Sequence, residues 1–152
     1  MKVETTRFGQ IDVPEGDIIN LPEGVLGFPE ATRYVLLEHD SEGTPFKWLQ
    51  SLDDPNLAFI VIDPHMVVEG YVVEFDEEMQ DEVGCKYADE KFAMMAIVNV
   101  PQDQPIEMTV NVRAPIIVHT EKRVGWQVIL PNEEYPIRHR LFADAEVGKK
   151  SN

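Results

Sequence analysis

Short runs of Val, Ile, Leu and aromatic residues are separated along the chain, every ten residues or so, by Gly, Pro, Asn or Asp. This spacing is typical of a β-sandwich or β-barrel, because βαβ units would need longer amphipathic segments between the strands. The pattern therefore predicts an all-β, mainly antiparallel, barrel-like single domain. The expected strands cover residues 1–8, 10–13, 17–20, 33–38, 46–52, 57–62, 68–75, 92–100, 108–113, 116–119 and 126–130.

The segments between these strands carry turn signals and one helix signal. Pro14-Glu15-Gly16, Pro22-Glu23-Gly24 and Ser41-Glu42-Gly43 each place a turn-forming residue before a glycine that accepts positive φ. One short helix is expected near residues 76–83, with Asp76 as its N-cap and Gly84 just after its last turn. The eleven prolines, spread along the chain, argue against longer helices.

The length of 152 residues fits one domain, which we expect to cover residues 1–142, followed by a flexible tail at 143–152. The single cysteine, Cys85, has no second cysteine for an internal disulfide, and the N-terminus lacks the apolar core of a signal peptide. The apolar runs are too short to cross a bilayer. We therefore expect a cytoplasmic protein that does not enter a membrane.

The charge of the chain argues against polyanionic partners. With 28 Asp and Glu against 13 Lys and Arg, the net charge is −15, which repels nucleic acid and anionic membranes. Between Glu69 and Glu90, nine acids against one base, Lys86, give a charge of −8. Such a run is either a solvated face or an acidic face that attracts a basic partner protein, and the sequence leaves both open.

The most conspicuous candidate for chemistry is the tetrad Asp53-Asp54-Pro55-Asn56, which lies between two expected strands. Two adjacent carboxylates occur in acid/base and metal sites. However, Asp and Asn also bond to nearby backbone N–H groups, and proline presets φ for a type I turn. We therefore interpret the tetrad as a turn that joins two strands.

A second candidate is Asp63-Pro64-His65, for which we expect the Asp and His side chains to point to opposite faces at a strand end. The four histidines and Cys85 show no zinc spacing, and the phosphate-loop and nucleophile-elbow motifs are absent from the sequence. We expect no cofactor and no enzymatic activity. The alternative is a small β-barrel hydrolase or isomerase that uses Asp53, Asp54 or Asp63 with His65.

Several stretches, in this order and spacing from about residue 7 to residue 142, resemble the bacterial flagellar assembly factor family FliW. The stretches are Phe8-Gly9-Gln10-Ile11-Asp12-Val13, Leu21-Pro22-Glu23-Gly24-Val25-Leu26-Gly27-Phe28, Phe46-Lys47-Trp48-Leu49-Gln50-Ser51, Leu57-Ala58-Phe59-Ile60-Val61-Ile62-Asp63-Pro64, Asn111-Val112-Arg113-Ala114-Pro115-Ile116-Ile117-Val118 and Gly125-Trp126-Gln127-Val128-Ile129-Leu130.

The resemblance implies a non-enzymatic, barrel-like β protein that switches between two partners. Proteins of this family bind flagellin in the cytoplasm. When flagellin has been exported, the free factor binds the RNA-binding translational repressor CsrA and relieves the repression of flagellin mRNA. The resemblance thus implies flagellin and CsrA as partners, without direct contact with nucleic acid, and we expect a monomer when the protein is free.

The place of the partner site is inferred from the charge and the apolar pattern, and not from the family. The acidic segment is expected to attract CsrA, whose RNA-binding surface is basic. The candidate contact residues are Glu69, Tyr71, Glu74, Asp76, Glu77, Glu78, Asp81 and Glu82. For the amphipathic helices of flagellin, the apolar candidates expected to be exposed are Val67, Val68, Tyr71, Val73 and Met79.

Overall fold

The alternation of apolar and polar residues produces short strands throughout the computed structural model, which describes residues 1–38, 44–73, 92–101 and 105–141. The strands in these residues are β1 (Lys2–Thr5), β2 (Gly9–Asp12), β3 (Ile19–Asn20), β4 (Arg33–Glu38), β5 (Lys47–Ser51), β6 (Ala58–Ile62), β7 (Phe92–Asn99), β8 (Thr109–Val110), β9 (Ile116–His119), β10 (Val124–Gln127) and β11 (His139–Arg140). Short 3-10 helices are formed by η1 (Glu15–Asp17), η2 (Pro64–Met66) and η5 (Pro105–Glu107).

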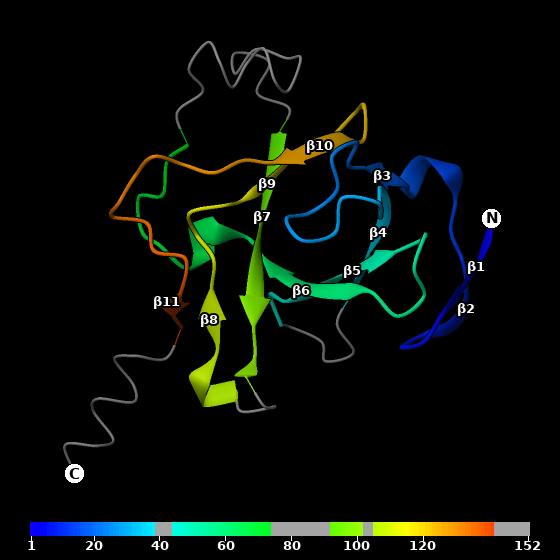
Figure 1. The fold of residues 1–152 in the computed structure, drawn as a ribbon, viewed down its shortest axis with the longest axis horizontal. Coiled ribbons are helices and arrows are strands. Elements are labelled where there is room, and N and C mark those ends of the chain that lie inside the picture. The colour runs from blue at the N-terminus through cyan, green and yellow to red at the C-terminus, as the bar shows by residue number, and fades with distance from the viewer. Residues whose placement is uncertain (39–43, 74–91, 102–104, 142–152) are drawn as a thin grey trace.

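Seven of the described strands close into a mixed barrel (Figure 1). Their order around the barrel is β7, β6, β5, β4, β3, β10 and β9, and β9 returns to pair with β7. Neighbours in this ring are antiparallel except β3 and β10, which run parallel and pair Asn20 with Val124. The prediction of an all-β, mainly antiparallel, barrel-like domain is confirmed.

The side chains alternate between the inside and the outside of the barrel, as the period of two along a strand requires. Tyr34 on β4 and Ile116 on β9 belong to a core cluster that gathers residues from strands around the ring. Their neighbours Val35 and Ile117 belong to two separate clusters on the outer side. Among the described residues, three small cores therefore stabilise the fold, one inside the barrel and two between the barrel and the segments that cover it.

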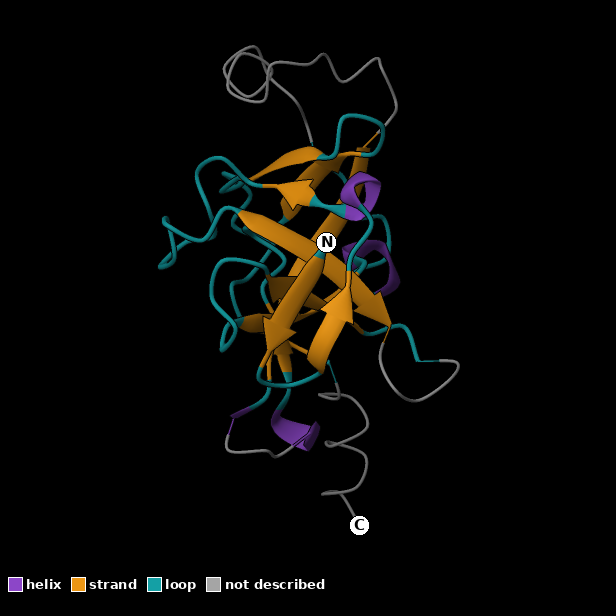
Figure 2. Ribbon diagram, turned by 90° about the vertical axis from the view of Figure 1, so that its right-hand side faces the viewer, coloured by secondary structure: helices purple, strands orange, loops and turns teal. Residues whose placement is uncertain are grey.

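The N-terminal hairpin of β1 and β2 covers one of these outer faces, and Figure 2 brings it toward the viewer. Val3 and Val13 pack with Val35 of β4. In the turn of the hairpin, the guanidinium carbon of Arg7 lies 4.2 Å from the centroid of the Trp48 ring, within the range of a cation–π interaction. The hairpin is thus attached to β4 and β5 rather than being a free arm.

Two differences from the predicted elements concern the strands. Residues 68–73 of the expected strand at 68–75 form no strand, because Gly70 has φ +73° and the chain turns after η2. The strand β11 was not predicted, since two polar residues give no apolar signal. The expected helix near residues 76–83 and the tail at 143–152 lie outside the described residues.

Candidate functional site

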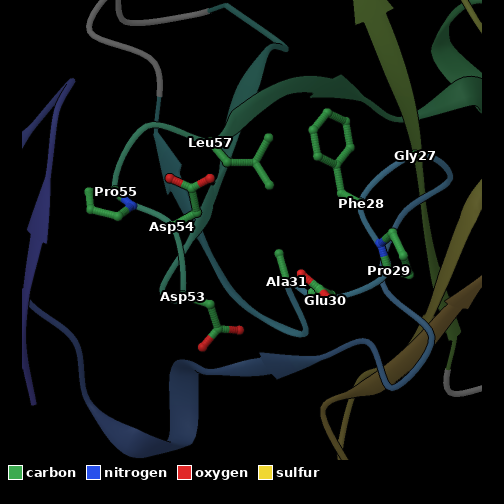
Figure 3. A pocket seen from close by; sticks show the side chains of 9 residues that line it. All are labelled: Gly27, Phe28, Pro29, Glu30, Ala31, Asp53, Asp54, Pro55 and Leu57. Atoms are coloured by element: carbon green, nitrogen blue, oxygen red, sulfur yellow. The ribbon is translucent and has the colours of Figure 1, made fainter.

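The two carboxylates of the 53–56 tetrad serve different partners. Asp53 Oδ2 accepts hydrogen bonds from the backbone N–H groups of Thr32 (2.9 Å) and Arg33 (3.0 Å), and Asp53 Oδ1 accepts from the Arg33 guanidinium at 3.0 and 2.9 Å. Asp54 Oδ1 instead accepts from the N–H of Asn56 at 2.9 Å. In Figure 3 the two side chains point in different directions, so they do not form a paired acid/base site.

The tetrad is a turn, as the sequence indicates. The N–H of Leu57 donates to the carbonyl of Asp54 at 3.1 Å, and Ser51 Oγ accepts from the N–H groups of Asp53 and Asp54. The same turn also holds the N-terminal hairpin, because the N–H of Thr6 donates to the carbonyl of Pro55 at 2.9 Å. The tetrad therefore fastens β4 and the hairpin to the loop between β5 and β6.

The hydrogen bonds of Asp53 make the stability of the fold depend on pH. Partial burial opposes ionisation, but the bonds from Thr32 and Arg33 outweigh it and hold the pKa of Asp53 below its usual value. A carboxylate with a lowered pKa stabilises the fold at pH values above its unfolded pKa of about 4, and this contribution disappears as the pH falls through the folded pKa.

We therefore expect Asp53→Asn to lower the free energy of unfolding by about 1 to 2 kcal/mol at pH 7, because two backbone N–H groups and Arg33 lose their charged acceptor. The difference from the wild type should shrink below about pH 4. Urea unfolding at a series of pH values measures it. Asp12→Asn is the control, since Asp12 pairs with the N-terminus on the surface and such pairs contribute about 0 to 1 kcal/mol. A difference that stays constant down to pH 2.5 or so would contradict this role of the carboxylate.

The expectation for Asp63 and His65 is wrong. Their side chains do not point apart but meet, with His65 Nδ1 2.8 Å from Asp63 Oδ1. The reason is that η2 begins at Pro64, so Asp63 is the N-cap of a 3-10 turn and also accepts the N–H of His65 at 2.9 Å. Both side chains are about half exposed, and the five residues of β6 place them roughly 15 Å or more from the 53–56 turn.

A hollow of about 520 Å³ lies between two loops at the start of β6 (Figure 3). Residues 27–31 line one side of it, and residues 53–55 together with Leu57 line the other. We call it the Phe28 pocket. The sequence predicts only the turn at Pro22-Glu23-Gly24, just before the first of these loops. The available signal was a pair of large apolar residues, Leu26 and Phe28, on either side of Gly27, where no strand is expected.

The first loop is held in place by its own backbone and by the barrel. Gly24 has φ +68° and donates its N–H to the carbonyl of Leu21 at 2.8 Å, and the N–H of Phe28 donates to the carbonyl of Val25 at 2.6 Å. The N–H of Leu26 donates to Gln127 Oε1 of β10 at 2.8 Å. As a result the side chains of Leu26 and Phe28 remain 59% and 43% exposed on a fixed loop.

The structure describes two of the predicted partner-contact residues. Glu69 is exposed after η2. Tyr71 is buried: its hydroxyl donates to the carbonyl of Val112 at 2.7 Å, its ring lies 4.7 Å from that of Tyr135, and burial raises its pKa. The expectation that Tyr71 and Val73 are exposed is therefore wrong, because the second outer core takes both.

The other six predicted contact residues, and the apolar candidate Met79, lie outside the described residues. They are Glu74, Asp76, Glu77, Glu78, Asp81 and Glu82. Val67 and Val68 are half-buried, while Met66 and Val72 beside them are exposed. The apolar surface near Glu69 is thus formed by different residues from those expected.

Two further observations bear on metals and membranes. In residues 1–38, 44–73, 92–101 and 105–141, no group of three His, Cys, Asp or Glu side chains could hold a metal ion. The same ranges contain no helix that is both long enough and apolar enough to cross a membrane.

Comparison with known proteins gives consistent matches along almost the whole chain. The family model described as FliW protein matches residues 2–141. The chain is 39% identical over 146 residues to a flagellar assembly factor FliW of Syntrophus aciditrophicus (strain SB). The aligned residues make up 96% of this chain and 90% of that relative. It is 37% identical over 144 residues to a flagellar assembly factor FliW of Caldanaerobacter subterraneus subsp. tengcongensis, with 95% of each chain covered.

Among solved structures, a crystal structure of the flagellar assembly factor FliW superimposes with a TM-score of 0.82 at 34% sequence identity, over 95% of this chain and 99% of that one. The family match includes every described strand, from β1 to β11, and therefore the whole barrel.

Proposed function

Since the chain belongs to the FliW family of flagellar assembly factors, which are not enzymes, we propose that it binds flagellin in the cytoplasm and, when free, binds and antagonises the translational repressor CsrA. Membership in this non-enzymatic family argues against the alternative of a β-barrel hydrolase or isomerase. The carboxylates named for that alternative have other uses, since Asp53 and Asp54 hold a turn and Asp63 caps η2.

The observation that carries this proposal is the concentration of negative charge after Glu69. More than half of the net charge of −15 lies between Glu69 and Glu90. A basic surface that holds RNA on CsrA would be attracted to this segment, and the RNA itself would be repelled, within a screening length of about 8 Å at physiological salt. The proposed contacts are Glu69 together with the six acids from Glu74 to Glu82.

Tyr71 supports this proposal in a different way from the one expected. Its hydroxyl bond to Val112 and its contact with Tyr135 fix the chain two residues after Glu69. In our proposal Tyr71 positions the start of the acidic segment, while the neighbouring exposed side chains of Met66 and Val72 offer apolar surface for an amphipathic helix of flagellin. Competition of the two partners requires that their sites overlap or are coupled.

Charge reversal in the acidic segment tests this proposal. The variant in which Glu77, Glu78, Asp81 and Glu82 are all changed to Lys should bind CsrA on the order of tenfold or more weakly, mainly through slower association, and with a smaller dependence on salt. Surface plasmon resonance at several salt concentrations measures both effects. The matched control changes Glu4, Glu15, Glu23 and Glu133 to Lys, which alters the net charge equally at exposed positions elsewhere.

If both variants lose affinity equally, net charge and not this segment attracts the repressor. If neither variant changes affinity or salt dependence, the acidic segment is only a solvated surface. A pull-down with flagellin and CsrA from the same source, alone and in competition, tests the exchange of partners. Simultaneous capture of both would contradict it.

A further inference from the structure

We propose that the Phe28 pocket is a second docking site, which takes a linear segment of a partner protein that carries a lysine or arginine next to a large apolar residue. The residues that line this site are not part of the acidic segment after Glu69, and the proposal does not depend on the function proposed for that segment. The proposal is based on the size of the pocket, its exposed apolar wall, its charge and its fixed loop.

The apolar wall provides the binding energy. The pocket volume of about 520 Å³ is within the range of roughly 300 to 1,000 Å³ that binding hollows occupy. Phe28 packs edge-on against Phe59, with ring centroids 5.5 Å apart, yet 43% of Phe28 remains exposed beside Leu57 and Ala31. An apolar side chain of a partner would cover this surface and use Phe28 as an aromatic anchor.

The charge of the pocket selects the kind of segment. Glu30, Asp53 and Asp54 line it, and no lysine or arginine does. Asp53 is already neutralised by Arg33. The remaining two acids, Glu30 and Asp54, have no ion pair within the described part of the chain, and Asp54 accepts only one backbone N–H there. A cationic side chain next to the apolar one would therefore find complementary charge, whereas an acidic segment would be repelled.

The wall of the pocket is already ordered, so binding does not have to organise it. The backbone of Phe28 and Pro29 passes so close to Gly24 that a Cβ atom there would lie 2.3 Å from the Phe28 carbonyl oxygen. The bond from Leu26 to Gln127 ties the loop to β10, and the bonds of Asp53 fix the opposite wall. A prepared site loses less conformational entropy on binding, which favours affinity for a short peptide.

The pocket and Glu69 lie at opposite ends of β6. Leu57 immediately precedes this strand, whereas η2 and Glu69 follow it. Five strand residues span roughly 15 Å or more, so the one or two peptide residues seated in the pocket would not contact Glu69. The protein could therefore hold one segment in the Phe28 pocket while another partner occupies the surface around Glu69.

Fluorescence anisotropy with the full chain tests the proposal. The probe is a fluorescein-labelled short peptide in which lysine alternates with leucine and phenylalanine, and the matched peptide has glutamate in place of each lysine. We expect the lysine peptide to bind and the glutamate peptide not to bind. Phe28→Ala and Glu30→Lys should each weaken binding about tenfold or more, whereas Glu133→Lys, at an exposed position that does not line the pocket, should leave it unchanged.

Amide shifts in a ¹⁵N-labelled sample locate the peptide independently of the variants. Gly27, Glu30 and Leu57 should move during the titration. Absence of binding up to about 1 mM, equal binding of the two peptides, or shifts that centre on Glu69 would each overturn the proposal. Because Phe28 and Glu30 are exposed, both variants should fold, and a thermal melt verifies this. CsrA or flagellin binding to Glu30→Lys is measured separately, so failure of this inference is distinguishable from failure of the proposed function.

Discussion

Gly24→Ala is expected to lower the free energy of unfolding by about 3 kcal/mol or more, a large share of the total for a domain of this size. Gly24 has φ +68°, which alanine adopts only with strain. In addition, the new Cβ atom would lie 2.3 Å from the Phe28 oxygen and 2.7 Å from the Pro29 Cα. Both of these are backbone atoms, so the clash cannot be relieved by a side-chain rotation and the loop must move.

Gly27→Ala, in the same loop, separates the cost of backbone strain at positive φ from the cost of the steric clash. Gly27 also has positive φ, +92°, but a Cβ atom there would meet nothing within 4 Å. Its substitution should therefore cost only the conformational strain, about 1 kcal/mol. Urea unfolding followed by tryptophan fluorescence compares the two variants. Equal losses for Gly24→Ala and Gly27→Ala would show that the close approach of Phe28 and Pro29 does not hold the loop.

Gly125→Ala is expected to be the second most damaging change, with a loss of about 2 to 4 kcal/mol. Gly125 lies on β10 opposite Val118 of β9. A Cβ atom at this position would lie 2.5 Å from the Ile117 carbonyl oxygen and 2.9 Å from a methyl group of Val118. Alanine would therefore push β10 away from β9, next to the place where the barrel closes.

The control for Gly125→Ala is Gly16→Ala in η1, where the added Cβ atom has open space and φ is not positive. That change should alter stability by less than about 0.5 kcal/mol. Hydrogen exchange of the amides on β9 and β10 gives a second measurement, and Gly125→Ala should speed it selectively at these two strands. Wild-type stability in Gly125→Ala would contradict the close packing of β9 and β10.

Features determined by neighbours in sequence were predictable. The turn at 53–56 follows from the local chemistry of Asp54, Pro55 and Asn56, and the structure confirms it. The hydrogen bonds that Asp53 accepts from Thr32 and Arg33 were not predictable in the same way, because they join residues about 20 positions apart. Only the pairing of β4 with β5 brings these groups together.

The segment after β6 shows how an apolar pattern misleads. Val68, Tyr71 and Val73 suggested a strand and an exposed edge, since their spacing resembles that of other strands in the chain. The chain instead turns at Gly70, and Tyr71 and Val73 enter a core whose partners, such as Tyr135, come from the end of the sequence. Tertiary packing therefore determined both their conformation and their burial.

The Phe28 pocket could be suspected from the sequence but not located. Leu26 and Phe28 are large apolar residues outside the strand pattern, which signals either burial in a loop or exposure. Their exposure depends on Gln127, which is about 100 residues away and holds the loop open against β10. The opposite wall depends on the 53–56 turn.

The parallel pairing of β3 with β10 has a consequence for the synthesis of the protein. The seam joins Asn20 to Val124, supported by a bond from the Asn20 N–H to the Arg123 carbonyl at 2.8 Å. A ribosome adds roughly 5 to 20 residues per second, so roughly 5 to 20 s pass between the synthesis of Asn20 and that of its partner Val124. During that time the antiparallel strands β3 to β6 can form a meander, but the edge of β3 has no neighbour. The sheet of the nascent chain therefore stays open at β3 until β10 has been made, and only then can the barrel close.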